Sequence, residues 1–243
     1  MIVLFTDFGR NGPYTAQMIA VIRQHDASIE VIDLIANAPA YDIRSSAFLL
    51  AAFINQFPAG TVFLTVVDPG VGSERLPVVL EADGYWFVGP GNGLLDVVIK
   101  RAGKARLFEI DTKGFNLSSS FHGRDLFAPV AARIAANDDW PGKRQLSPEP
   151  VHKDWPDDLY EIIYIDDYGN AYTGIRGECL NKNMVINING NQVTYAETFS
   201  QREKGELLWY VNSIGLVEIA VNQDSASQSF GIEVGTKITV KDK

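Results

Sequence analysis

Apolar and polar positions follow two rhythms along residues 1–136, and the rhythms predict two kinds of element. Residues 2–5 form a short apolar run. Residues 61–67 are a nearly continuous run of β-branched and aromatic side chains, which is typical of a strand covered on both faces. In residues 14–23 the apolar positions instead repeat every three and four residues, which predicts an amphipathic helix.

Turn and capping residues support further elements. Asp42 is placed to cap a helix over residues 43–57, and Pro58 lies just past its end. Asp83-Gly84 separates two apolar runs and predicts a tight hairpin. The remaining elements expected in this half are strands at 31–34 and 107–110 and helices at 94–100 and 125–136. Strands that alternate with helices predict an α/β domain with a mostly parallel sheet over residues 1–136.

The second half of the chain has a different pattern. Residues 137–158 are polar and contain four prolines, which predicts a linker. From residue 159 onward, six or seven short strand-like runs are separated by glycines. This spacing predicts a smaller all-β, barrel-like domain over residues 159–243.

Composition and charge restrict the class of protein. The chain has 243 residues, of which 46% are hydrophobic, so it is expected to fold around a real core. The longest apolar stretch, residues 47–54, is far shorter than the roughly 20 residues that cross a bilayer. The net charge of −9 argues against a nucleic-acid partner, which normally needs a basic face. Cys179 is the only cysteine, which fits a reducing cytoplasm.

Two acidic residues follow predicted strands of the α/β half. Asp7 comes after the first strand, and Asp68 comes after the run at 61–67. Ligands of open α/β sheets bind at the carboxyl ends of strands, so both acids are candidate ligand contacts. Arg75 follows Asp68 closely, and an arginine next to a carboxylate fixes its orientation. The plainer alternatives are turn acids and a surface ion pair.

His122 and Asn92 are the other candidates in this half. His122 stands in a polar serine-rich loop directly before a predicted helix, a position compatible with a catalytic or a structural role. The glycine-rich runs at 70–72 and 89–93 lack the spacing of phosphate-binding loops, so we expect neither NAD nor ATP. The second run does end a strand and open a helix, which lets Asn92 point at a ligand.

Polar residues also gather at two turns of the β-rich half. Asp166, Tyr168 and Asn170 share one tight turn, and Ser213 follows the end of another strand. These side chains could contact a ligand or could serve the turns themselves. The sequence alone leaves both possibilities open.

Taken together and in order, these motifs resemble one family. They are T-D-F-G at 6–9, D-P-G-V-G at 68–72, P-x-N-G-L-L at 90–95, F-H-G-R-D at 121–125, Y-G-N at 168–170 and N-S-x-G at 212–215. The chain resembles the S-adenosyl-L-methionine hydroxide adenosyltransferases, which are related to fluorinating and chlorinating enzymes that use the same substrate. The resemblance extends over almost the whole chain.

The resemblance implies an activity, an assembly and a site. It implies hydrolysis of S-adenosyl-L-methionine to adenosine and L-methionine, without a cofactor or metal, in homotrimers whose sites lie between an N-terminal domain and a neighbour's C-terminal domain. The implied catalytic residues are Asp68, Arg75 and His122. The residues implied to contact adenosine or the methionine end are Asp7, Tyr41, Asp166, Tyr168, Asn170 and Ser213.

The chemistry of these side chains suits that reaction. Attack at the ribose 5′ carbon of a sulfonium releases a neutral thioether, so the reaction needs an aligned, poorly hydrated water rather than an acid. Asp68 or His122 could accept the proton of that water. The resemblance implies that halogenating relatives have a tyrosine at the position of Asp68. A carboxylate at that position would repel a halide. We therefore expect water as the nucleophile.

Two other classes compete with this interpretation. One is a protein that binds adenosine or S-adenosyl-L-methionine without catalysis. In such a protein Asp68 and Arg75 would form an ordinary ion pair, with His122 beside it. The other is a metal-dependent phosphoesterase that uses Asp7, Asp68, His122 and Asp125. Such sites usually contain several imidazoles and carboxylates, and this chain offers one suitable histidine.

Overall fold

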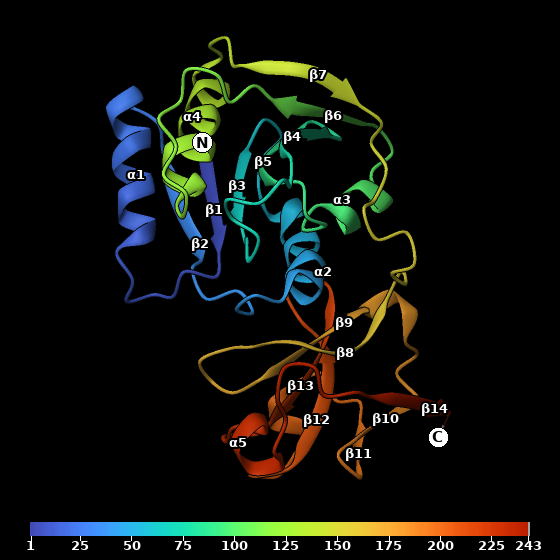
Figure 1. The fold of residues 1–243 in the computed structure, drawn as a ribbon. Helices are drawn as coiled ribbons and strands as arrows, with labels where there is room; N and C mark the ends of the chain where they lie inside the picture. Colours follow the sequence, from blue (N-terminus) through green and yellow to red (C-terminus); the bar gives the residue numbers. More distant parts are fainter. Residues whose placement is uncertain (243) are drawn as a thin grey trace. The chain divides into compact units, whose positions relative to one another are not determined.

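A computed structural model describes residues 1–242, with helices and strands alternating in the first part and strands dominating the second (Figure 1). The chain divides into two compact units. The first contains Met1–Leu50 and Phe57–Asp154, and the second contains Ala51–Gln56 and the chain from Trp155 onward. Each unit has its own cluster of buried apolar side chains and is described separately.

A seven-stranded sheet forms the centre of the first unit. Its strands are β1 (Ile2–Thr6), β2 (Val31–Ile35), β3 (Val62–Val66), β4 (Pro77–Ala82), β5 (Tyr85–Pro90), β6 (Ala105–Ile110) and β7 (Gly142–Leu146). They lie in the order β2-β1-β3-β5-β4-β6-β7. The first four of these are parallel, while β4 is antiparallel to both β5 and β6, so five of the seven strands share one direction. The sheet is mostly parallel, as predicted.

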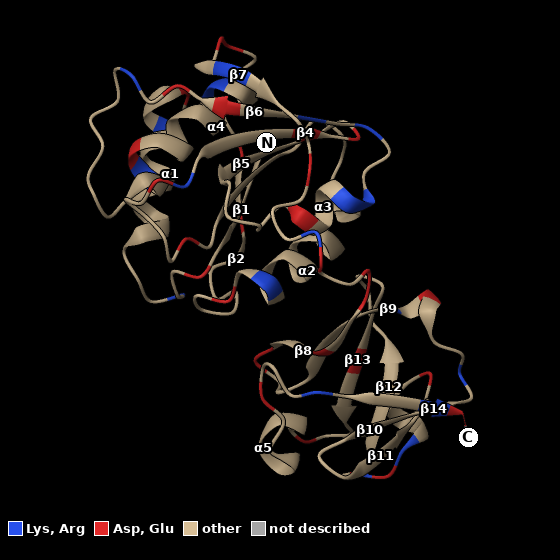
Figure 2. Cartoon of the chain, turned by 45° about the vertical axis from the view of Figure 1, so that its right-hand side comes forward, with Lys and Arg blue, Asp and Glu red and all other residues tan. Residues whose placement is uncertain are grey.

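Four helices accompany this sheet: α1 (Tyr14–His25), α2 (Ile43–Phe53), α3 (Asp96–Arg101) and α4 (Ala128–Ala136). Helices α1 and α4 pack together, and α4 also contacts β1 and β3 (Figure 1). Ile2 and Leu4 of β1 share a buried core with Met18 of α1 and Val130 of α4. The central strands β1, β3 and β5 contain no charged residue (Figure 2), as expected for strands covered on both faces.

Two local predictions are confirmed in this unit. The backbone N–H of Ser45 donates to Oδ1 of Asp42 at 3.0 Å, so Asp42 caps α2. The helix ends at Phe53, earlier than predicted, and a short 3-10 turn follows. Asp83 and Gly84 have φ values of +47° and +86°. Positive φ at both central residues is what a two-residue type I′ hairpin requires.

Strand β7 corrects the prediction of a linker over residues 137–158. It forms an edge of the sheet and pairs antiparallel with β6. Lys143 and Arg144 of β7 each form an ion pair with Glu109 of β6, both at 2.6 Å. The strand has no apolar alternation because it is exposed, so the sequence pattern could not reveal it.

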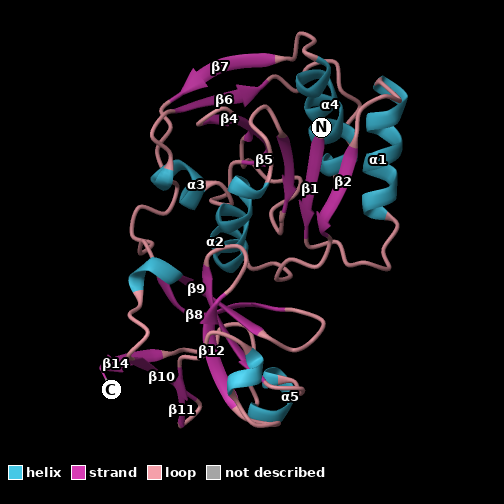
Figure 3. Ribbon diagram, turned by 180° about the vertical axis from the view of Figure 1, so that it is seen from behind, coloured by secondary structure: helices cyan, strands magenta, loops and turns pink. Residues whose placement is uncertain are grey.

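The second unit consists mainly of antiparallel strands (Figure 3). They are β8 (Leu159–Ile165), β9 (Ala171–Arg176), β10 (Met184–Ile188), β11 (Asn191–Thr194), β12 (Leu207–Val211), β13 (Leu216–Val221) and β14 (Thr239–Asp242). One sheet has the order β12-β13-β9-β8 and the other β11-β10-β14. Single bridges, Tyr195 to Trp209 and Glu161 to Lys237, connect the two sheets. The expected set of short strands is confirmed.

A short helix, α5 (Ala226–Phe230), was not expected from the sequence. Ser225 caps it by accepting a hydrogen bond from the backbone N–H of Gln228 at 3.1 Å. Across residues 1–242, no helix combines the length and the apolar character that a membrane span requires.

Candidate active site

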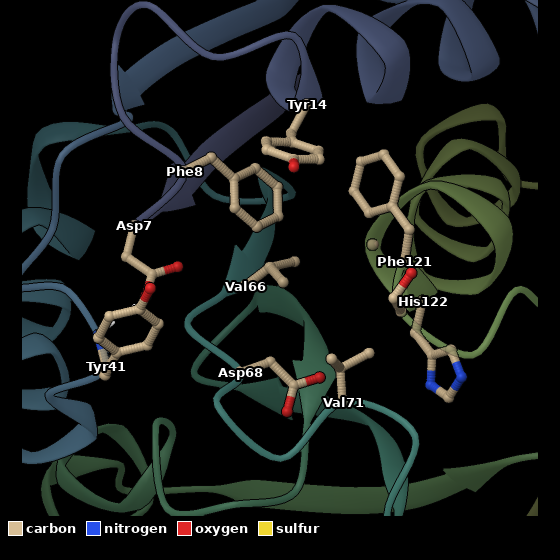
Figure 4. A pocket seen from close by; sticks show the side chains of 11 residues that line it. Asp7, Phe8, Tyr14, Tyr41, Val66, Asp68, Val71, Phe121 and His122 are labelled. Atoms are coloured by element: carbon tan, nitrogen blue, oxygen red, sulfur yellow. Dashed lines mark hydrogen bonds between the residues drawn. The ribbon is translucent and has the colours of Figure 1, made fainter.

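Strands β1 and β3 bring the two predicted acids to one pocket. Because these strands are parallel neighbours, their carboxyl ends lie at the same edge of the sheet. Asp7 follows β1 and Asp68 follows β3, and both line a pocket of about 230 Å³ (Figure 4). Tyr41 and His122 line the same pocket. The structure thus collects four of the sequence candidates at the expected edge of the sheet.

Asp68 is held by a bidentate ion pair with Arg75. Nε of Arg75 donates to Oδ1 and Oδ2 of Asp68 at 2.9 and 3.0 Å, and Nη2 also donates to Oδ2. The side chain of Asp68 is only 4% exposed and that of Arg75 only 9%. This is a largely buried, oriented pair rather than the mobile surface pair that the sequence left open.

A tight loop returns Arg75 to Asp68. The backbone N–H of Val71 donates to the carbonyl of Asp68, so the chain turns directly after β3. Gly72 has a φ of +81°, and a Cβ at this position would lie 2.6 Å from the carbonyl oxygen of Ser119. Only glycine therefore allows this loop to pack against the segment before His122.

Arg75 also contacts His122. Nη2 of Arg75 lies 3.0 Å from Nδ1 of His122, although the residues are 47 positions apart. A guanidinium only donates, so Nδ1 accepts and the neutral ring carries its proton on Nε2. Burial lowers the pKa of His122, and the charge of Arg75 lowers it further. The imidazole is therefore held neutral in one tautomer. Phe127 stacks under the guanidinium, with its ring centroid 5.3 Å from Cζ.

Asp7 and Tyr41 form the other side of the pocket (Figure 4). The backbone N–H of Tyr41 donates to Oδ2 of Asp7 at 3.0 Å, and Tyr41 has a φ of +61°. Burial is the main cause that raises the pKa of Asp7. The side chain of Tyr41 is largely exposed, so its ring is available to a ligand.

Three aromatic side chains of the pocket were not predicted. Phe8, Tyr14 and Phe121 pack on one another with ring centroids 5.2 to 5.8 Å apart, and they lie together above Asp68 and His122 in Figure 4. They supply an apolar wall next to Asp68 and His122. Phe8 and Phe121 do belong to two of the quoted motifs, but a sequence cannot distinguish a pocket wall from a core.

Asn92 does not line this pocket. Its Nδ2 donates to the carbonyl of Val67 at 2.9 Å, and its Oδ1 accepts from the N–H of Leu94 at 3.2 Å. The side chain thus satisfies backbone groups at the end of β3 and in the turn before α3. Its bond to Val67 anchors the residue directly before Asp68.

The candidates of the second unit lie in one larger pocket of about 910 Å³. It is lined by Asp166, Tyr168, Asn170 and Ser213, as well as by residues that the sequence did not single out. Oδ1 of Asp166 accepts from the N–H groups of Tyr168 and Asn170, both at 2.9 Å. Asp166 therefore shapes its own turn, and Tyr168 is 81% exposed at the pocket.

Glu218 is a buried acid of this second pocket that the sequence reading missed. Tyr210 donates through its hydroxyl to Oε1, and Nδ2 of Asn212 donates to Oε2 at 2.9 Å. Burial raises the pKa of Glu218. The only available sequence signal was an acid inside the apolar run of β13. In the described part of the chain, no three His, Cys, Asp or Glu side chains gather to hold a metal ion.

The first unit is an α/β fold that holds a carboxylate, a guanidinium and an imidazole together beside the ends of its strands. The second unit consists of antiparallel sheets. This combination defines a class of two-domain enzyme. The family model of the SAM hydroxide adenosyltransferase N-terminal domain matches residues 2–142, and that of the C-terminal domain matches residues 160–239. The chain belongs to the SAM hydroxide adenosyltransferase family.

The chain is similar over its full length to curated relatives and to a solved structure. The chain is 32% identical to an (R)-S-adenosyl-L-methionine hydrolase of Methanocaldococcus jannaschii, covering 99% of this chain and 95% of the relative. It is 34% identical to another of Salinispora arenicola, covering 97% and 95%. A fluorinase of Nocardia brasiliensis is 23% identical, covering 99% and 96%. The crystal structure of an uncharacterized conserved protein from Thermotoga maritima superposes with a TM-score of 0.88 at 32% identity, covering 99% of both chains.

Proposed function

We propose that this enzyme hydrolyses S-adenosyl-L-methionine to adenosine and L-methionine by attack of water on the ribose 5′ carbon. Full-length relatives that carry the name (R)-S-adenosyl-L-methionine hydrolase support this proposal. The single structural observation that carries it is that Arg75 bonds both Asp68 and His122, and that these two side chains line one pocket with Asp7. Such an array can orient a water molecule and take its proton.

The array favours Asp68 as the group that accepts the proton. Nδ1 of His122 already accepts from Arg75, and Nε2 of the neutral ring carries a proton. His122 can therefore donate to the water oxygen but is not free to accept. Oδ1 of Asp68 accepts only one bond from Arg75 and keeps a lone pair for the water. One hydrogen bond from His122 and one to Asp68 would fix the water for attack.

The electron balance requires neither a general acid nor a metal. The water oxygen forms a bond to C5′, the C5′–S bond breaks, and its electron pair neutralises the sulfonium. The leaving thioether is neutral, and the water's second proton passes to Asp68 and then to solvent. The wall of Phe8, Tyr14 and Phe121 keeps the reacting atoms poorly hydrated.

The same proposal assigns the binding residues. Asp7 accepts hydrogen bonds from the ribose hydroxyls, and the exposed ring of Tyr41 packs against the nucleoside. In the second unit, the side chains that contact adenine or the methionine end are Asp166, Tyr168, Asn170 and Ser213. We reassign Asn92 from ligand contact to positioning of the strand end that carries Asp68.

We further propose a cytoplasmic homotrimer, in which each site combines the first unit of one subunit with the second unit of another. The division of the candidate residues between two separate pockets supports a shared site. The single bridges that join the two sheets at both edges support a barrel-like second unit. Light scattering that gives a particle of about one chain mass, 26.8 kDa, would contradict the trimer.

A product assay tests the function directly. The protein is incubated with each sulfonium epimer of S-adenosyl-L-methionine, with and without EDTA, chloride or fluoride, and the products are separated by chromatography. We expect adenosine and methionine in equal amounts, unchanged turnover with EDTA and no 5′-halo nucleoside, because the Asp68 carboxylate repels halides. A halogenated product, or binding without turnover, would overturn the proposal.

A further inference from the structure

Glu218 lies on the face of β13 that points to the second-unit pocket. Its neighbours Val217 and Ile219 point the other way, into the buried apolar cluster. In the sheet register, Glu218 lies opposite Tyr210 of β12 and opposite Tyr172 of β9. The carboxylate is thus placed between two tyrosines in the middle of the four-stranded sheet, which is an unusual position for an acid.

The carboxylate is fully engaged by neutral groups. Glu218 is 2% exposed, and its two oxygens accept from the Tyr210 hydroxyl and the Asn212 amide. Neither donor carries a charge that would balance the carboxylate. A buried acid whose donors are all neutral is costly unless a ligand supplies the opposite charge.

The other residues that line the pocket add to its negative charge. Asp166 and Asp224 line it with Glu218, and its described lining contains no Lys or Arg. The groups that face Glu218 from the packed strands are Tyr172 and Tyr210, whose pKa values are themselves raised by burial and by its charge. Burial and the Asp166 charge both raise the pKa of Glu218, which a bound cation would reverse.

We propose that Glu218 is a specificity-determining residue that selects a primary ammonium group, the one carried by the amino-acid end of the substrate, in the second-unit pocket. The inference rests on the proposed function, because that function supplies a ligand with an ammonium. Ammonium is preferred to a guanidinium because both oxygens of Glu218 already accept from Tyr210 and Asn212, which leaves no free carboxylate edge for a planar bidentate contact, whereas an ammonium acts as a point charge. Glu218 supplies negative charge from strand β13, and Asp166 supplies it from the turn that follows β8.

The test compares two neutral thioether probes that differ in the amino-acid group. S-adenosyl-L-homocysteine carries the ammonium, and 5′-methylthioadenosine does not. Titration calorimetry measures both with the unmodified chain, Glu218→Gln and the control Glu203→Gln, which changes an exposed acid of the same unit. We expect Glu218→Gln to weaken the first probe by about tenfold or more and the second less than about twofold, with the control unchanged.

A second variant covers the case in which Glu218→Gln does not fold. Glu218→Leu combined with Tyr210→Phe removes the carboxylate together with its hydroxyl donor, so that neither is left unpaired. It should lose the same discrimination. Equal weakening of both probes, or no weakening of either, would overturn the role of Glu218. The proposed function is decided separately, by whether the unmodified chain converts S-adenosyl-L-methionine to adenosine.

Discussion

Nη2 of Arg75 lies 3.0 Å from Nδ1 of His122, while the same guanidinium clamps the carboxylate of Asp68. One donor-only group thus orients both side chains that can reach a water molecule. It leaves His122 with its proton on Nε2, and in the proposed mechanism Asp68 is then the acceptor. Each role can be tested separately.

Asp68→Asn should slow turnover by about 10²-fold or more while adenosine still binds, because an amide cannot take the proton of the water. Steady-state kinetics and adenosine calorimetry measure the two effects. Glu74→Gln, an exposed acid in the same loop, is the matched control and should be neutral. Full activity of Asp68→Asn would exclude Asp68 as the base.

The pH dependence of kcat should report His122. Its pKa lies below the ordinary 6.5, so the neutral ring predominates at pH 7 and is lost as the pH falls through the lowered value. A protonated ring carries a proton on Nδ1 and can no longer accept from Arg75. We expect kcat to fall on the acid side with an inflection below 6.5. His122→Asn, which does not titrate, should be slower at pH 7 and lack that inflection.

Asp7→Ala should raise the adenosine Kd by at least about tenfold, since a carboxylate that accepts from vicinal hydroxyls contributes about 1.5–3 kcal/mol. Calorimetry measures this, with exposed Asp139→Ala as the control. Burial raises the pKa of Asp7, so wild-type affinity should fall as the pH drops through that raised value. Adenosine binding that is unchanged in Asp7→Ala would refute the assignment.

Asn92→Ala should lower kcat by about tenfold with little change in adenosine Kd, because its bond to the Val67 carbonyl positions the residue before Asp68. Asn189→Ala is a matched control, since Nδ2 of Asn189 also bonds backbone carbonyls, those of Phe230 and Gly231, in the second unit. The control should lose about 1–3 kcal/mol of stability, because it loses these bonds and because Asn189 has a φ of +47°, which alanine tolerates poorly, but it should keep kcat. Equal effects of the two variants on kcat would make Asn92 merely structural.

Local patterns were sufficient for the elements and for part of the site. Apolar runs predicted β1 and β3, and Asp42 and Asp83-Gly84 marked a helix cap and a hairpin through interactions within a few residues. Asp7 and Asp68 could be placed at one sheet edge because parallel neighbours end on the same side.

Other features depended on contacts between distant segments. The exposed strand β7 exists through its pairing with β6 and the ion pairs of Glu109. The Arg75–His122 bond, the aromatic wall and the engagement of Asn92 by Val67 join residues from separate segments. Glu218 stands in an apolar run, and only the sheet register directs it to a pocket. Periodicity encodes which face of an element is buried, whereas the partner that meets each polar atom is decided when the elements pack.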